Sequence, residues 1–220
     1  MYQFDLHCHT KGVSKCGTVL PEEGARLYIE AGYSGVVITN HFNRYTFDVM
    51  PEGSSWDETM DFYLSGWKRF RDAAGERLTV LLGMEIRFDE NENDYLVYGV
   101  TEELLRAHPE FLEMDAASFS AFARQEGLLF YQAHPFRNGM SVVNPQLLDG
   151  IETYNGHPRH ESRNDIAMAW AEKYGLQQIS GSDFHDPDGY ALGGILTRER
   201  IRSQKDLLKA LREGPLLIRK

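Results

Sequence analysis

The fold of this 220-residue chain is constrained most by a repeated alternation of strand-like and helix-like segments. Short apolar runs that are rich in β-branched residues, such as 35–39, are typical of buried parallel strands. This alternation predicts an α/β fold with a mostly parallel, closed or nearly closed sheet that is covered by helices. We expect strands at 1–9, 35–39, 78–86, 95–100, 128–133, 150–154, 176–180 and 216–218, and helices at 21–31, 55–75, 118–126, 161–174 and 203–213.

Several predicted helices carry recognisable boundary signals. Pro21 begins one of them and Gly32 follows it, which is the usual asymmetry of helix ends. Ser55-x-x-Glu58 resembles a capping box at the start of another. The sequence shows no repeat, linker or low-complexity segment. A single domain over residues 1–220 is therefore predicted.

The composition is that of an ordinary globular protein, with 42% hydrophobic and 25% charged residues. No apolar stretch approaches the roughly 20 residues of a membrane span. No charged-then-apolar leader precedes the first strand, so we expect a cytoplasmic protein. Two cysteines, Cys8 and Cys16, are too few for a disulfide framework. The formal charge of −10 disfavours extended nucleic acid as a partner.

Histidine and acidic residues lie at the carboxyl ends of the predicted strands or directly after these strands. In an extended strand, residues two apart point the same way, so His7 and His9 present two imidazoles on one side. Because the carboxyl ends of the strands of a (β/α) barrel converge on one face, these scattered residues are expected to meet there. They are His7, His9, His41, Glu85, His134, Asp183 and His185.

Five imidazoles and two carboxylates form a set of metal ligands rather than a structural zinc knot, which would contain pairs of cysteines. Imidazole and carboxylate suit zinc, manganese or iron. The set exceeds the needs of one ion, so two or three divalent ions are expected. Such a site polarises a phosphoryl oxygen and lowers the pKa of bound water, which favours hydrolysis.

The motifs His7-x-His9, Thr-Asn-His41, Gly-x-Glu85, Ala-His134-Pro and Gly-Ser-Asp183-x-His185, in this order, resemble the PHP (polymerase and histidinol phosphatase) family. The resemblance extends from about residue 3 to residue 190. It implies a distorted (β/α)7, TIM-like barrel with a trinuclear site at the carboxyl ends of the strands. One ion is then held by His7, His9, Glu85 and Asp183. Glu85 bridges to a second ion bound by His134, and a third ion is bound by His41 and His185.

Three positions differ from the usual family pattern. Cys16-Gly17 stands where many relatives carry an acid or a histidine, so Cys16 is a candidate thiolate ligand. Asn40 replaces the usual aspartate before His41, and we expect it to tune the site. Asp94 lies where some relatives supply another histidine, and it is a candidate substitute for that ligand.

Other polar residues follow the same strands. Arg137 and Arg159 are candidates for clamping a phosphate by paired hydrogen bonds, although surface arginine is the default. His157 is a candidate substrate contact. Glu152 and Asn155 either position other groups or make ordinary hydrogen bonds at the end of the sheet.

The function predicted from these residues is hydrolysis of a small phosphomonoester by a metal-bound hydroxide at a di- or trinuclear site. Glu85, Asp183 and His185 are expected at its catalytic centre. One alternative is a phosphodiesterase or nuclease that acts on nucleotide ends. Another is a metal-binding regulatory module without catalysis. The oligomeric state is left open.

Overall fold

The computed structural model describes all 220 residues, and its strands form two hydrogen-bonded sheets. The five-stranded sheet has the order β11–β10–β1–β2–β4. β1, β2 and β4 run parallel, whereas β10 is antiparallel to both β1 and β11. The strands are β1 (Tyr2–Cys8), β2 (Gly35–Ile38), β4 (Thr79–Leu82), β10 (Gly193–Thr197) and β11 (Leu216–Arg219).

The six-stranded sheet has the order β3–β5–β6–β7–β8–β9, and β6 is antiparallel to both of its neighbours. Both sheets are therefore mixed, whereas a mostly parallel sheet was expected. The connection 88–93 between β5 and β6 is too short for a parallel crossover, which needs a dozen or more residues. The strands are β3 (His41–Phe42), β5 (Met84–Arg87), β6 (Asp94–Tyr98), β7 (Leu129–Gln132), β8 (Gly150–Asn155) and β9 (Gln177–Gly181).

The single strand expected at 78–86 is two strands, β4 and β5, which belong to different sheets. The break falls at Gly83, where a Cβ atom would lie 2.7 Å from Cγ1 of Val37 and 3.1 Å from the carbonyl oxygen of Val97. A residue with a side chain would not fit so close to both neighbouring strands. Glu85 is therefore inside β5, just beyond the carboxyl end of β4.

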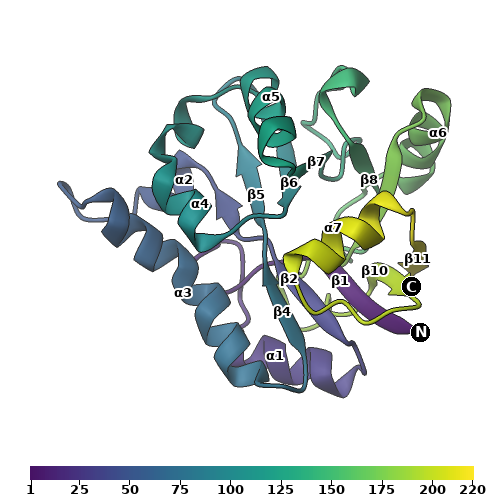
Figure 1. The fold of residues 1–220 in the computed structure, drawn as a ribbon, viewed down its shortest axis with the longest axis horizontal. Helices are drawn as coiled ribbons and strands as arrows, with labels where there is room; N and C mark the ends of the chain where they lie inside the picture. The colour runs from purple at the N-terminus through teal and green to yellow at the C-terminus, as the bar shows by residue number, and fades with distance from the viewer.

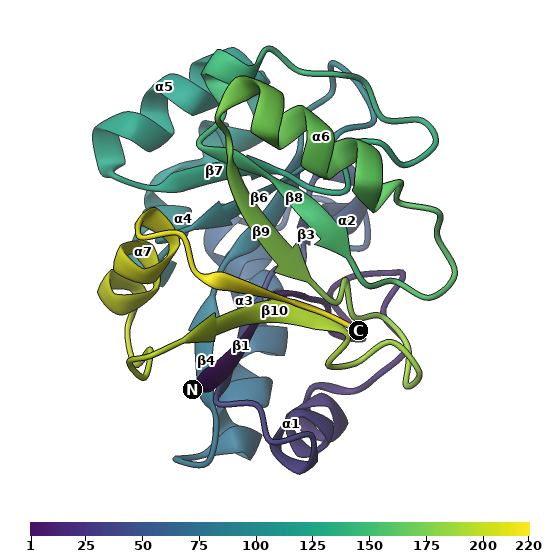
Figure 2. The ribbon, with the colours of Figure 1, turned by 90° about the vertical axis from the view of Figure 1, so that its right-hand side faces the viewer.

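The helices lie outside the strands. In Figures 1 and 2, α5 and α6 flank the six-stranded sheet, and α1 and α3 lie beside the five-stranded one. The capping box of Ser55 and Glu58 is confirmed. Two helices and two strands escaped prediction because they are short or lack a clear pattern: α2, α4, β3 and β10. The helices are α1 (Pro21–Glu30), α2 (Arg44–Phe47), α3 (Trp56–Ala74), α4 (Glu102–Ala107), α5 (Ala116–Glu126), α6 (Asn164–Tyr174) and α7 (Gln204–Arg212), with 3₁₀ turns η1 (Pro109–Glu113) and η2 (Pro145–Leu147).

Three clusters of buried apolar side chains hold these layers together. One of them combines side chains from both sheets, such as Leu6 of β1 and Leu96 of β6, with Leu207 and Leu211 of α7. The two sheets therefore share a core. None of the helices combines the length and the apolar character that a membrane span requires.

Candidate metal centre

The candidate metal centre begins at the end of β1. The Nε2 atoms of His7 and His9 lie 3.1 Å apart, and both residues are buried. Cys8 between them is buried in an apolar cluster that includes Tyr28 and Val36. The two imidazoles thus lie on the same side of the strand, as expected from the spacing of His7 and His9.

Glu85 lies at the middle of the cluster, where its carboxylate contacts four imidazoles. Its Oε1 is 3.2 Å from Nε2 of His7 and 3.2 Å from Nε2 of His134. Its Oε2 is 3.3 Å from Nε2 of His9 and 2.8 Å from Nδ1 of His41. The register of β3 and β5 places His41 directly beside Glu85. One carboxylate thus contacts imidazoles from three segments of the chain: the end of β1, β3 and the residues after β7.

Asp183 completes the first group of ligands. Its Oδ1 lies 3.3 Å from Nε2 of His7 and 3.4 Å from Nε2 of His9. The backbone at Asp183 has a φ of 50°, and His134 has a φ of 27°. Left-handed backbone is uncommon outside glycine, and such conformations cluster at functional sites. Two of the expected ligands therefore occupy strained positions.

The separation of these atoms fits divalent ions. Nitrogen and oxygen ligands bind zinc at about 2.0–2.2 Å, so neighbouring ligand atoms around one ion lie roughly 3.0–3.5 Å apart. The four distances from His7 and His9 to Glu85 and Asp183 fall within this range. Nδ1 of His41 and Oε2 of Glu85 are buried and 2.8 Å apart, yet neither makes a hydrogen bond. Buried polar atoms without partners need an explanation, and a shared cation supplies one.

The remaining expected ligands form a second group beside the first. Ligand atoms of His9, Cys16, His41 and His185 lie within 4.8 Å of one another. Cys16 is exposed, whereas His9 and His185 are buried. The structure thus brings the thiol to three imidazoles, which is the arrangement that a thiolate ligand needs. All eight expected metal ligands meet at this end of the sheets.

Asp94 has a different partner from the one expected. Arg87 donates from Nε to Oδ1 of Asp94 at 2.8 Å and from Nη2 to Oδ2 at 2.7 Å. The antiparallel register of β5 and β6 pairs these two residues. Asp94 still lies within 4.8 Å of ligand atoms of His41 and Glu85. Sequence reasoning missed Arg87, because the turn between β5 and β6 was not recognised.

The carboxylate of Glu152 accepts hydrogen bonds from two of the expected ligands, His7 and His134. Its Oε1 accepts a hydrogen bond from Nδ1 of His7 at 3.0 Å. Its Oε2 accepts bonds from the backbone N–H of His134 and from Nδ2 of Asn155, each at 2.9 Å. A proton on Nδ1 leaves the Nε2 lone pair of His7 free for an ion. The positioning alternative for Glu152 and Asn155 is thus the one that the geometry favours.

We expect Glu152→Gln to lower the affinity for metal by about 10- to 100-fold, the usual effect of losing a partner that orients a ligand. In glutamine an NH2 group replaces one of the two carboxylate oxygens. At least one of the three donors around position 152 would therefore face another donor. Isothermal titration of metal into chelator-treated protein measures this effect. Glu172→Gln, on the exposed side of α6, is the matched control. Equal affinity of both variants would contradict the role of Glu152.

Burial and charge interactions together set the protonation of the cluster. Burial lowers the pKa of His7, but the carboxylates of Asp183, Glu152 and Glu85 raise it well above its usual value. Burial raises the pKa of Asp183, but the imidazoles of His7 and His185 bring it well below normal. Burial and the neighbouring His9 lower the pKa of His185 to about 2. Ion binding must therefore displace protons from some imidazoles, while His185 is already neutral.

A cavity of about 410 Å³ opens over these ligands, and all three expected substrate-binding residues line it. Nη2 of Arg137 donates to Oδ2 of Asp183 at 2.6 Å, while its buried Nε has no partner. Arg159 is more exposed and pairs with Asp186. Nδ1 of His157 accepts the backbone N–H of Arg159, which leaves the proton of its neutral ring on Nε2. Burial lowers the pKa of His157 to about 4.

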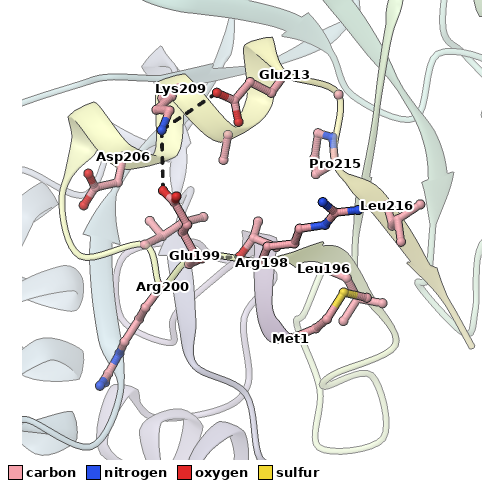
Figure 3. A pocket seen from close by; sticks show the side chains of 14 residues that line it. Met1, Leu196, Arg198, Glu199, Arg200, Asp206, Lys209, Glu213, Pro215 and Leu216 are labelled. Carbon is pink, nitrogen blue, oxygen red and sulfur yellow. Dashed lines mark hydrogen bonds and ion pairs between the residues drawn. The ribbon is translucent and has the colours of Figure 1, made fainter.

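Another cavity, of about 550 Å³, lies at the opposite end of β1, between α7 and the edge of the five-stranded sheet. Figure 3 shows Lys209 of α7 between Glu199 and Glu213, at 3.4 and 3.9 Å. The lining contains no histidine or cysteine. This cavity therefore lacks the ligands that distinguish the other end of the strand.

The PHP domain sequence model matches residues 5–214 of this chain, which confirms the resemblance and extends it to α7. No curated protein matches the chain in sequence. Solved structures also resemble it, among them three that are each less than 20% identical to the chain.

The first is a two-domain protein from Bacteroides vulgatus that contains a predicted PHP-like metal-dependent phosphoesterase (TM-score 0.64, 19% identity, 99% of this chain and 64% of that one). The second is PsfC from Pseudomonas syringae (TM-score 0.68, 15% identity, 94% and 88%). The third is the lesion-specific endonuclease PfuEndoQ from Pyrococcus furiosus (TM-score 0.58, 17% identity, 98% and 57%). The chain thus spans less than two thirds of the first and third of these proteins.

Proposed function

The chain belongs to the PHP domain family, and we propose that it is a metal-dependent phosphoesterase that hydrolyses a small phosphomonoester. The observation that carries this proposal is the position of Glu85, whose carboxylate contacts four imidazoles at 2.8–3.3 Å. A carboxylate shared in this way can bridge two ions. We propose that the site holds two or three divalent ions. Its imidazole, carboxylate and thiol ligands suit zinc, manganese or iron.

The ions would be held by His7, His9, Glu85 and Asp183 on one side and by His41, His185 and Cys16 on the other, with His134 at Glu85. When bound, they would supply a Lewis acid for the phosphoryl oxygens and a lowered pKa for the attacking water.

The protein itself orients the substrate. Arg137 lines the cavity over the metal ligands and is fixed through Nη2 to Asp183, which orients its guanidinium group for a phosphoryl oxygen. The Nε2–H of His157 provides a second, neutral donor. Arg159, at the more exposed side of the cavity, adds positive charge. We propose that these three residues hold the phosphoryl group while Glu85, Asp183 and His185 form the catalytic centre beneath it.

Elemental analysis and an activity panel test this function. Protein purified without chelator should contain two or three equivalents of divalent metal and hydrolyse at least one phosphomonoester. Chelation should abolish the activity, and manganese, zinc or iron should restore it, because water is activated only when ions are present. Full metal loading without turnover of any ester in a broad panel would overturn the proposal.

A second candidate function is cleavage at the end of a nucleic acid, which the fold shared with the Pyrococcus endonuclease favours. The net charge of −10 weighs against a long phosphate-contact surface, but not against a short terminus. Degradation of a single-stranded oligonucleotide that exceeds the turnover of all monoesters would favour this alternative.

We also propose that the two sheets together form a distorted (β/α)7 barrel as one domain over residues 1–220. The contacts between the two sheets support it. On one side the chain passes directly from β4 to β5 through Gly83, and on the other side the backbone N–H of His9 donates to Phe184 at 3.0 Å. The core that the sheets share supports it as well.

A further inference from the structure

A third cavity, of about 580 Å³, adjoins the cavity of about 410 Å³ over the metal ligands, which we call the metal cavity. Cys16, His41 and Arg87 line both of them, so these three side chains form the common wall. We call this neighbouring cavity the side groove. Its other walls come from the start of α2 and from the turn between β5 and β6. A substrate whose phosphoryl group lies over the ligands can extend its alcohol portion into this groove.

The side groove offers no free positive charge. Lys15 pairs with Asp48, and Arg44 pairs with Asp89 and Glu113. Arg87 pairs with Asp94 and Glu92. Three cations and three carboxylates line the groove: Lys15, Arg44, Arg87, Asp89, Glu90 and Glu92. A second phosphate would have to separate one of these pairs, so the groove favours an uncharged group.

The arginines of the metal cavity are paired as well, because Arg87, Arg137 and Arg159 contact Asp94, Asp183 and Asp186. The metal cavity is also lined by five imidazoles. What distinguishes the metal cavity is its imidazoles and its position over the metal ligands, since His41 is the one histidine that lines the side groove. A phosphoryl group would therefore lie over the metal ligands, and the rest of the ester would extend into the side groove.

Tyr45 gives the side groove an aromatic wall. It is the most exposed of the large aromatic side chains, at 66% of its surface. Nζ of Lys15 lies 3.6 Å from the ring centroid and covers one face, which leaves the other face available. Oδ1 of the neighbouring Asn43 accepts the N–H of Thr46, and its Nδ2 makes no hydrogen bond within the protein. An aromatic face beside a free amide donor suits a hydroxyl-bearing ring.

We propose that the side groove binds the leaving group of the substrate as an uncharged, hydroxyl-bearing ring, such as a sugar or a nucleoside, packed against Tyr45. This inference rests on the proposed phosphomonoesterase function. It makes the groove a determinant of specificity, because the alcohol is recognised separately from the phosphoryl group.

Matched substrates test the inference on the metal-loaded protein. We expect kcat/KM for ribose 5-phosphate or adenosine 5′-monophosphate to exceed that for glycerol 3-phosphate by about tenfold, the size expected for one ring on an aromatic side chain. Fructose 1,6-bisphosphate should lose this advantage, because its second phosphate meets paired cations. A gain with ribose 5-phosphate assigns recognition to the sugar, and a gain with the nucleotide alone assigns it to the base. Equal kcat/KM for ring and open-chain esters would overturn the inference.

Tyr45→Ala should reduce the ratio between ring and open-chain esters to about one, mainly through KM. Tyr174→Ala, which removes an exposed tyrosine from α6, should keep the wild-type ratio. An unchanged ratio in Tyr45→Ala would refute the role of Tyr45.

A binding measurement separates this inference from the function on which it rests. Saturation-transfer NMR with adenosine and with ribose should detect contact with the wild-type protein and lose it in Tyr45→Ala. If no ester is hydrolysed but this contact depends on Tyr45, the proposed function fails and the groove stands. If esters are hydrolysed without such contact, the groove assignment fails alone.

Discussion

Asp183→Asn should lower phosphomonoester hydrolysis by more than about 100-fold, beyond the 10- to 100-fold loss typical of a residue that only supports a ligand. Oδ1 of Asp183 lies within 3.4 Å of Nε2 of both His7 and His9, and Oδ2 accepts from Arg137. Asparagine has nearly the same volume and tolerates left-handed backbone, so the φ of 50° is not disturbed. The variant therefore removes the charge while keeping the shape.

Steady-state kinetics and the metal content of the purified variant measure this effect together. Both should fall, because the same atom contributes to ion binding and to the catalytic centre. Asp165→Asn, at an exposed position in α6, is the matched control and should behave as wild type. A biological role that persists unchanged in Asp183→Asn would favour the alternative of a regulatory module without catalysis.

Asp5→Ala should reduce the free energy of unfolding by at least about 3 kcal/mol, because each donor left without an acceptor in the interior costs about 1–3 kcal/mol. Asp5 is fully buried. Its Oδ1 accepts the backbone N–H groups of His7 and Ser182, and its Oδ2 accepts the hydroxyl groups of Tyr28 and Ser182. Burial raises the pKa of Asp5, and these hydrogen bonds oppose that shift.

Urea unfolding of chelator-treated protein isolates this effect from the loss of metal. Asp5→Asn should be less destabilising than Asp5→Ala, since its Oδ1 retains both backbone donors and the hydroxyl of Tyr28 can rotate to accept from its amide. Asp165→Ala controls for removal of an exposed carboxylate. Equal unfolding midpoints for Asp5→Ala and wild type would show that the network around Asp5 contributes no stability.

The class of the fold and most of its helices could be predicted because they depend on local sequence. Ser55 and Glu58 make their capping box within one turn, and Pro21 begins α1 where expected. The ligand candidates were equally visible, because an imidazole or carboxylate directly after an apolar strand is a short-range pattern. The structure brings these seven residues to one end of the sheets, together with Cys16, which only the family resemblance had indicated.

The directions of the strands could not be predicted in this way. β6 is antiparallel because the connection before it is short, and β10 pairs with β1 across most of the length of the chain. Gly83 divides one apolar run into two strands because Val37 and the backbone of Val97 approach it from different sheets. These contacts join residues that are distant in sequence, and no local periodicity records them.

The sequence by itself thus determined the α/β class, the helix ends and the set of groups able to bind metal, because these follow from side-chain chemistry and spacing within a few residues. Only the tertiary structure decided which partner each of these side chains contacts. It assigned Glu152 to His7, Arg87 to Asp94 and Glu85 to four imidazoles at once, and it placed Tyr45 beside the metal cavity. Such pairings depend on the packing of one strand against another, and packing is a property of the whole chain.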